Sequence, residues 1–137
     1  LSALIKGAEL LPDNAEAHAN LAGAFRNAGM LKEALESSNI ALRINPTFSH
    51  VHNNLGLIHK DMGKFDEAIS CFERALLINP DFIQAHINLG GVLRIQEKLG
   101  AAESSFRRAL HLQPNSAIVL TSLASVLNDM SEPESAK

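Results

Sequence analysis

Residues 49–82, SHVHNNLGLIHKDMGKFDEAISCFERALLINPDF, align without a gap on residues 83–116, IQAHINLGGVLRIQEKLGAAESSFRRALHLQPNS. Each segment has Asn-Leu-Gly in its first half, then Ala and Phe, and a proline near its end. The period is 34 residues, which is the spacing between Pro12, Pro46, Pro80 and Pro114. Internal repetition is tested first because it decides the architecture of the whole chain.

The same period continues through the chain in several columns of residues. One column holds leucines, at Leu21, Leu55, Leu89 and Leu123. A second column holds small residues, at Ala22, Gly56, Gly90 and Ala124. A third column holds alanines, at Ala34, Ala68, Ala102 and Ala136. We therefore predict three complete repeats at residues 15–48, 49–82 and 83–116. Residues 1–14 are expected to form the second helix of a preceding repeat, and residues 117–137 a partial fourth repeat.

Each period contains two stretches with the helical spacing of apolar residues. Gly29 and Gly63 suit the left-handed residue that ends a first helix, because glycine has no Cβ. The prolines are expected to end each second helix. The residue after each proline has a side chain that can cap the next helix, which predicts N-caps at Asp13, Thr47, Asp81 and Asn115.

These columns resemble the tetratricopeptide-repeat (TPR) family, whose pattern is an aromatic, Leu-Gly and an aromatic, followed by Ala, Phe, Ala and Pro. The second repeat here has the matching residues His52, Leu55, Gly56, His59, Ala68, Phe72, Ala75 and Pro80. The second repeat departs from the pattern with histidines in both aromatic columns. Elsewhere, Ser38 replaces the phenylalanine of the first repeat, and Glu97 replaces the inter-helix glycine of the third. The resemblance implies an all-α, right-handed superhelical solenoid of antiparallel helix pairs. It also implies a protein-interaction scaffold that is not an enzyme.

In this family the first helix of each pair lines a concave groove. Asn20, Asn54 and Asn88 recur there every 34 residues, and an amide can both donate and accept hydrogen bonds. The segments around them are similar to the asparagine ladder of O-linked N-acetylglucosamine transferases, whose asparagines contact the backbone of substrate peptides. The resemblance implies an extended peptide in the groove, with Asn53 beside it. The alternative is that these amides bond only within or between helices.

A second recurring column is basic and holds Arg26, Lys60 and Arg94. It lies six residues after the asparagines and favours acidic side chains or a C-terminal carboxylate on the partner. The alternative is a solvated charge stripe. Asp61, which we also place in the groove, would reduce the positive field.

TPR domains that clamp the acidic tail of heat-shock chaperones require a lysine and an asparagine where this chain has Ala19 and Gly23. Their second basic pair falls here on Gln84 and Asn88. The resemblance therefore does not extend to that clamp.

The composition excludes several other function classes. The 137-residue chain has a formal net charge of −3, which is unlike a general nucleic-acid binder, and it has no basic cluster for a membrane surface. Its single cysteine, Cys71, cannot form an internal disulfide, and we expect an intracellular, cytoplasmic location. We expect no cofactor.

His50, His52 and His59 are the one cluster that resembles a metal site. Zinc requires four ligands, however, and two of these histidines occupy columns where the family packs aromatics, so we expect packing instead of metal binding. Cys71 has no neighbouring base pattern in the sequence and is not expected to act as a nucleophile. We predict no catalytic residue.

Two alternatives remain open. The chain can be the recruiting arm of a larger enzyme such as a glycosyltransferase, which the lack of an initiator Met and the half-repeats favour. It can also stack end to end through its terminal helices, where Leu4, Leu11, Leu120 and Leu127 would be exposed.

Overall fold

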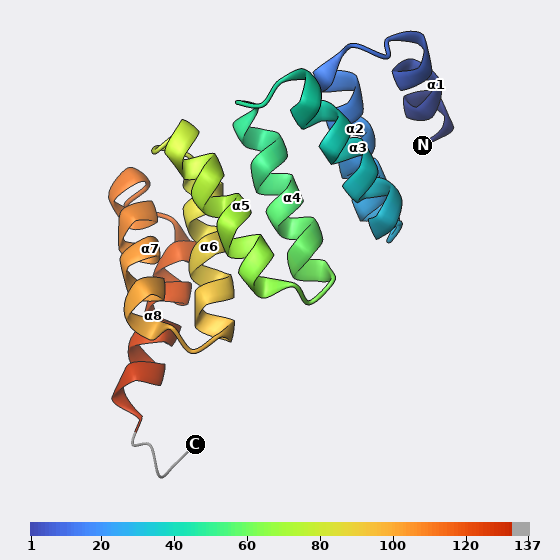
Figure 1. Ribbon diagram of the computed structural model, residues 1–137. Helices are drawn as coiled ribbons and strands as arrows, with labels where there is room; N and C mark the ends of the chain where they lie inside the picture. The colour runs from blue at the N-terminus through green and yellow to red at the C-terminus, as the bar shows by residue number, and fades with distance from the viewer. Residues whose placement is uncertain (133–137) are drawn as a thin grey trace. The chain divides into compact units, whose positions relative to one another are not determined.

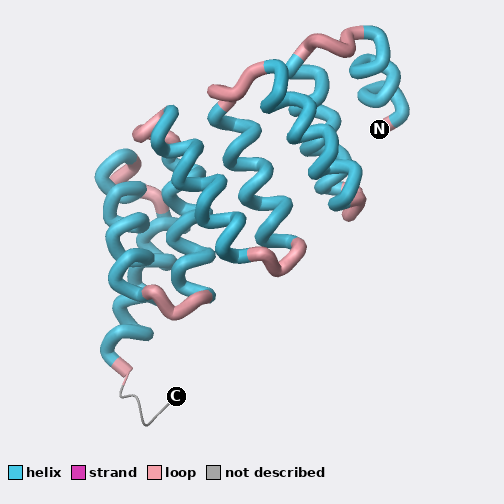
Figure 2. Tube along the Cα trace, viewed as in Figure 1, coloured by secondary structure: helices cyan, strands magenta, loops and turns pink. Residues whose placement is uncertain are grey.

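The computed structural model describes residues 1–132, and all the regular structure in that range is α-helix (Figures 1 and 2). The predicted all-α class is therefore confirmed. The column residue Ala136, at the end of the predicted partial repeat, lies outside the described residues. The helices are α1 (Ser2–Leu10), α2 (Ala15–Asn27), α3 (Leu31–Ile44), α4 (Ser49–Asp61), α5 (Phe65–Ile78), α6 (Ile83–Ile95), α7 (Leu99–Leu112) and α8 (Ala117–Ser131).

The chain divides into two compact units, Leu1–Asn79 and the part from Pro80 onward, which we call unit 1 and unit 2. In unit 1, α2 pairs with α3 and α4 pairs with α5; α1 packs on α2, and α4 contacts both α2 and α3. In unit 2, α6 pairs with α7, and α8 contacts both. Each unit thus consists of helix hairpins in which neighbouring helices cover one another's apolar faces.

In two hairpins a glycine of the first helix lies against a phenylalanine ring of the second helix. A Cβ placed on Gly56 would lie 2.5 Å from the ring of Phe72, and one placed on Gly90 would lie 2.8 Å from the ring of Phe106. Both rings are buried, with 0% and 2% of their surface exposed. The glycines of the small column are therefore required because the ring occupies the space that a side chain would need.

The α2–α3 hairpin holds a different pair of residues at the equivalent positions. Ala22 stands in the glycine column and Ser38 in the phenylalanine column, and both are buried. A methyl group is tolerated here because no ring competes for its space. The exchange leaves the Ser38 hydroxyl buried without a hydrogen-bond partner among the described residues, which is a cost to stability.

Each hairpin turns through a residue with left-handed backbone geometry. Gly29 and Gly63 have φ of 78° and 77°, as their predicted role requires, and the third turn uses Glu97 at φ 60°. The residue after each of them donates its N–H to a carbonyl five positions back, for example Lys64 N to His59 O at 2.8 Å. All three first helices therefore end in the same way, with one of the three turns carrying a side chain that strains it.

The predicted helix N-caps were wrong by one residue. The N-caps are Asn14, Phe48, Phe82 and Ser116, and of these Asn14 and Ser116 accept a hydrogen bond from the helix through their side chains. The residue after each proline instead lies inside a turn. Asn14 N, for example, bonds to Leu11 O at 3.1 Å, which places Pro12 and Asp13 at the two central positions.

The longest helix in the described part of the chain is α8, with 15 residues. Across residues 1–132, none of the helices combines the length and the apolar character needed to cross a bilayer.

Replacing Gly90 by Ala is predicted to lower the free energy of unfolding by roughly 1–2 kcal/mol, because overpacking against the Phe106 ring outweighs the higher helix propensity of alanine. The matched control is Gly91→Ala, since a Cβ there meets no atom within 4 Å. That variant should gain about 0.5–1 kcal/mol. Urea denaturation compares the two, and equal effects would contradict the packing argument.

Replacing Glu97 by Gly should raise the free energy of unfolding by about 0.5–1 kcal/mol. The left-handed conformation costs a non-glycine residue roughly 1–2 kcal/mol, and the extra freedom of glycine in the unfolded chain offsets part of that gain. Gly63→Ala is the converse variant and should destabilise by a similar amount, because the added Cβ has free space but an unfavourable φ. If thermal denaturation shows the same stability for the Glu97→Gly protein and the wild type, the strain at Glu97 is disproved.

Candidate functional site

The asparagine column lies on the first helix of each hairpin. Asn20 on α2 is exposed, while Asn54 on α4 and Asn88 on α6 are half-buried. Within unit 1, α2 and α4 contact each other, so two members of the column are carried by adjacent helices. Asn88 belongs to unit 2 and has interaction partners inside the protein.

Asn53, the fourth predicted groove asparagine, is buried with only 6% of its surface exposed, and it also interacts within the protein. This arrangement resembles the intramolecular alternative considered for the asparagines. Little of Asn53 is left for a peptide to contact, so it is not included in the site proposed below.

Two members of the basic column form ion pairs inside the protein. Arg26 Nε donates to Asp61 Oδ2 at 2.8 Å, joining the ends of α2 and α4 in unit 1. Arg94 Nε donates to Asp129 Oδ2 at 2.7 Å, joining α6 to α8 in unit 2. The hydrogen bond to Asp129 raises the pKa of Arg94, which stays protonated. Asp61 therefore neutralises an arginine of the column.

Lys60 is the exception in this column. In both ion pairs the aspartate follows the arginine by 35 residues, and the residue at that distance from Lys60 is Ile95. The ammonium group of Lys60 has no ion-pair or hydrogen-bond partner among residues 1–132. Lys60 is half-buried, and it is the member of the column whose charge is not neutralised by an ion pair.

The first histidine of each repeat has the same local role. Nε2 of His18, His52 and His86 lies 3.0, 2.8 and 2.8 Å from the carbonyl oxygen of the proline six residues earlier. A carbonyl only accepts, so this ring nitrogen must carry the proton and donate. These side chains therefore fasten each inter-repeat turn to the helix that follows it.

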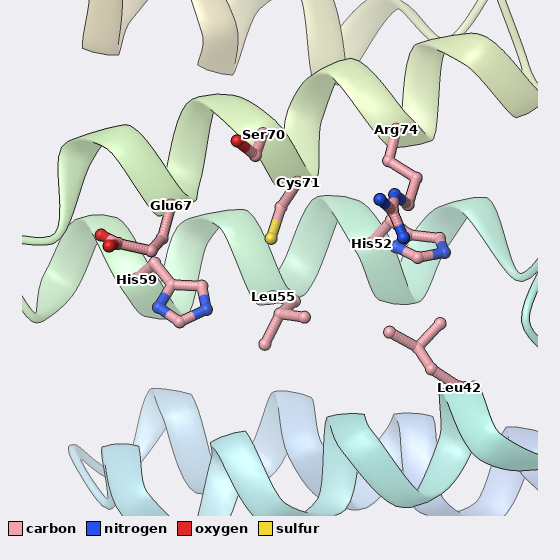
Figure 3. A pocket seen from close by; sticks show the side chains of 8 residues that line it. All are labelled: Leu42, His52, Leu55, His59, Glu67, Ser70, Cys71 and Arg74. Carbon is pink, nitrogen blue, oxygen red and sulfur yellow. The ribbon is translucent and has the colours of Figure 1, made fainter.

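Around His52 and His59 the structure contains a pocket of about 310 Å³ within unit 1 (Figure 3). It is lined by side chains from three helices: Leu42 of α3, His52, Leu55 and His59 of α4, and Glu67, Ser70, Cys71 and Arg74 of α5. Sequence analysis missed this pocket because its walls come from segments that are not adjacent in the chain. The one sequence signal for the pocket was His59, a histidine in a column where the family has an aromatic residue.

Burial shifts the ionisation of two groups in this pocket. It raises the pKa of the Cys71 thiol to about 11, so the thiol stays neutral and unreactive at pH 7. It lowers the pKa of His59 below the ordinary value, against an opposing effect of Glu67, so His59 is neutral at pH 7. His59 Nδ1 is shielded from solvent and has no hydrogen-bond partner among the described residues.

Residues 1–132 contain no group of three or more His, Cys, Asp or Glu side chains placed to hold a metal ion.

Two of the repeats match models of a known protein family. Tetratricopeptide-repeat models match residues 50–82 and residues 83–116. These two segments are tetratricopeptide repeats. They cover the second and third repeats predicted from the sequence, and no curated protein sequence was found to match the chain.

Solved structures with the same fold include TPR domains of different origins. The first TPR of Spaghetti (RPAP3), bound to the HSP90 peptide SRMEEVD, has a TM-score of 0.83 at 19% identity, covering 86% of this chain and 94% of its own. MamA has a TM-score of 0.86 at 19% identity, with 94% and 75% coverage. PilF of Pseudomonas aeruginosa has a TM-score of 0.84 at 29% identity, with 93% and 58% coverage. At these identities the likeness shows the TPR fold, and the matches do not single out transferase repeats.

The terminal helices expose the apolar side chains named in the sequence analysis. Leu4 and Leu11 are 38% and 55% exposed, and Leu120 and Leu127 are 46% and 40% exposed. Self-association through these helices stays a prediction.

A double-mutant cycle on Arg26 and Asp61 should give a coupling energy of about 0.2–1 kcal/mol, since both side chains are about a third exposed. The control is Lys60→Ala paired with Asp61→Ala, which should show no coupling. The free energies of unfolding are measured in urea at low and high salt. If the Arg26–Asp61 coupling energy is zero, or equals the Lys60–Asp61 coupling energy, the assignment of the ion pair is contradicted.

Proposed function

We propose that this protein is a protein–protein interaction scaffold that binds an extended peptide segment through the asparagines of its first helices. In unit 1, Asn20 and Asn54 contribute their amides as donors and acceptors to the peptide backbone, and Asn88 offers the same group on the first helix of unit 2. The observation that supports this most directly is the recurrence of an accessible amide at one helical position, since Asn20 is exposed and the other two are partly so.

The fold of known relatives supports the same role. A TPR domain of similar structure holds an HSP90 peptide, which shows that helix hairpins of this kind can hold a short peptide. This chain has Ala19, Gly23 and Gln84 at the positions of the chaperone-clamp residues. We therefore propose a peptide that is held by its backbone, in place of one held by clamped terminal carboxylates.

We propose that the basic column contributes through Lys60 alone. Arg26 and Arg94 already hold Asp61 and Asp129, so a partner carboxylate would have to displace an existing pair to reach either of them. Lys60 needs no such exchange. An acidic residue near the part of the peptide held by Asn54 would satisfy it, since both side chains lie on α4.

Peptide binding of this kind serves an independent scaffold and the recruiting arm of a larger enzyme equally well. The similarity of the asparagine segments to those of O-linked N-acetylglucosamine transferases supports the second possibility. In either case we propose that this chain performs no chemistry itself.

The test uses 12-residue peptides selected from a random display library on the wild-type protein. The triple variant Asn20→Ala/Asn54→Ala/Asn88→Ala should bind them roughly a hundredfold more weakly, at about 1 kcal/mol for each lost hydrogen bond. Affinity is measured by calorimetry, and circular dichroism verifies that the variant is folded. Methylating backbone nitrogens of the peptide should weaken binding as well.

Asn39→Ala is the matched control, because Asn39 is an exposed asparagine on α3, a second helix. It should leave the affinity unchanged. Selected peptides that bind the triple variant as tightly as the wild type would refute the proposed role of the asparagines. Lys60→Ala should weaken only those peptides that carry an acidic residue.

A further inference from the structure

Gly23 lies in the interior of α2 without a packing or backbone reason to be glycine. Its φ is not positive, unlike those of Gly29 and Gly63. A Cβ placed on Gly23 would meet no atom within 4 Å, whereas one placed on Gly56 would lie 2.5 Å from the Phe72 ring. Glycine in a helix interior lowers stability relative to alanine. The packing of the described residues therefore does not account for Gly23, and the space beside it is open.

This open position lies on the face of α2 that carries the proposed peptide site. Gly23 follows Asn20 by three residues and precedes Arg26 by three, and residues three or four apart are neighbours on a helix surface. The side chain of Arg26 reaches Asp61 of α4, with 2.8 Å between Nε and Oδ2. The part of α2 that holds Asn20 and Gly23 is therefore next to the part of α4 that leads to Asp61.

The residue of α4 at the same level is Leu57. It follows Asn54 by three residues and precedes Asp61 by four, so it neighbours both on the helix surface. The helices α2 and α4 contact each other and run in the same direction (Figure 1). One turn before the ion pair, an open position on α2 thus lies beside a leucine on α4. Leu57 is half-buried, so part of its apolar surface is accessible.

Unit 2 has the open space at this level without the leucine. The residue 34 after Leu57 is Gly91, and a further step of 34 leads to Ser125. One turn before the Arg94–Asp129 pair, α6 therefore has glycine and α8 has serine. A Cβ placed on Gly91 would also meet no atom within 4 Å. The open space next to an apolar side chain is thus a feature of unit 1.

We infer that the bound peptide places one apolar side chain, such as that of valine or leucine, over Gly23 and against Leu57. The missing side chain at Gly23 lets the peptide approach α2 closely at this level, and Leu57 supplies an apolar contact. This inference rests on the proposed function, because Asn20 and Asn54, one turn earlier, hold the peptide backbone. Unit 1 therefore selects peptides by an apolar residue in addition to binding their backbone.

The test selects 12-residue peptides from a random display library on the wild-type protein and measures their affinities by calorimetry. The selected peptides should share one apolar residue, and replacing it by serine should weaken binding at least fivefold. Leu57→Ser, which copies Ser125, should weaken binding of the original peptides at least fivefold as well. The two replacements combined should weaken binding little further, because each removes the same contact.

Gly23→Ala separates binding from stability. The added methyl group meets no atom of the protein and alanine favours a helix, so this variant should unfold at a higher temperature than the wild type. It should nevertheless bind the selected peptides at least threefold more weakly, because the methyl group occupies the space that the peptide enters. Gly7→Ala on α1 is the matched control: its Cβ is equally free, so it should gain stability and bind like the wild type.

These variants also separate the apolar contact from the role of the asparagines. If the Leu57 and Gly23 variants bind like the wild type and the triple asparagine variant does not, the apolar contact is overturned and backbone binding stands. If binding depends on Leu57 and Gly23 but not on the asparagines, the apolar contact stands and the role of the asparagines is refuted. Effects of Leu57→Ser and of the serine peptide that add in full would overturn the direct contact. A library that yields no binder would overturn both proposals.

Discussion

The contact between a backbone and a ring sets the geometry of two of the hairpins. At Gly56 and Gly90 a phenylalanine ring occupies the place of a side chain, so the two helices approach until ring and backbone touch. Interiors are close-packed, and a methyl group at this point has to displace a buried ring. The α2–α3 hairpin follows the same packing rule, because Ala22 fits in the glycine column where Ser38 replaces the phenylalanine ring. Helix pairing in this protein therefore depends on the combined volume at these two positions.

Three positions differ from their equivalents in the other repeats although the backbone around them is similar. The third hairpin turn has the left-handed backbone of the other two, yet it uses Glu97. The basic column has aspartate partners for two of its members, while Lys60 has Ile95 at the matching distance in sequence. His59 replaces a larger apolar residue and leaves a pocket. The first exception strains a turn, the second leaves a lysine without an ion pair, and the third leaves a pocket beside α4.

These exceptions separate two faces of α4. One face carries Asn54, and we propose that it holds a peptide backbone with an acidic group near Lys60. A different face carries His52, Leu55 and His59, which line the pocket. A helix-hairpin scaffold can present both because each helix buries only part of its circumference. The histidine–proline hydrogen bonds, at 2.8–3.0 Å, keep the turn before each first helix in place.

The sequence by itself determined the repeat length, the all-helical class, the left-handed glycines and the small column, because these depend on residues close in the chain and on their spacing. It placed the helix caps one residue early, since the turn that holds Pro12 and Asp13 is closed by a backbone bond that no side chain signals. Tertiary structure alone decided that Asn53 is buried, that Arg26 is paired and that Lys60 is not. It also decided the pocket, whose walls come from α3, α4 and α5. Burial, pairing and cavities depend on which distant side chains share a space, and periodicity within one chain does not specify that.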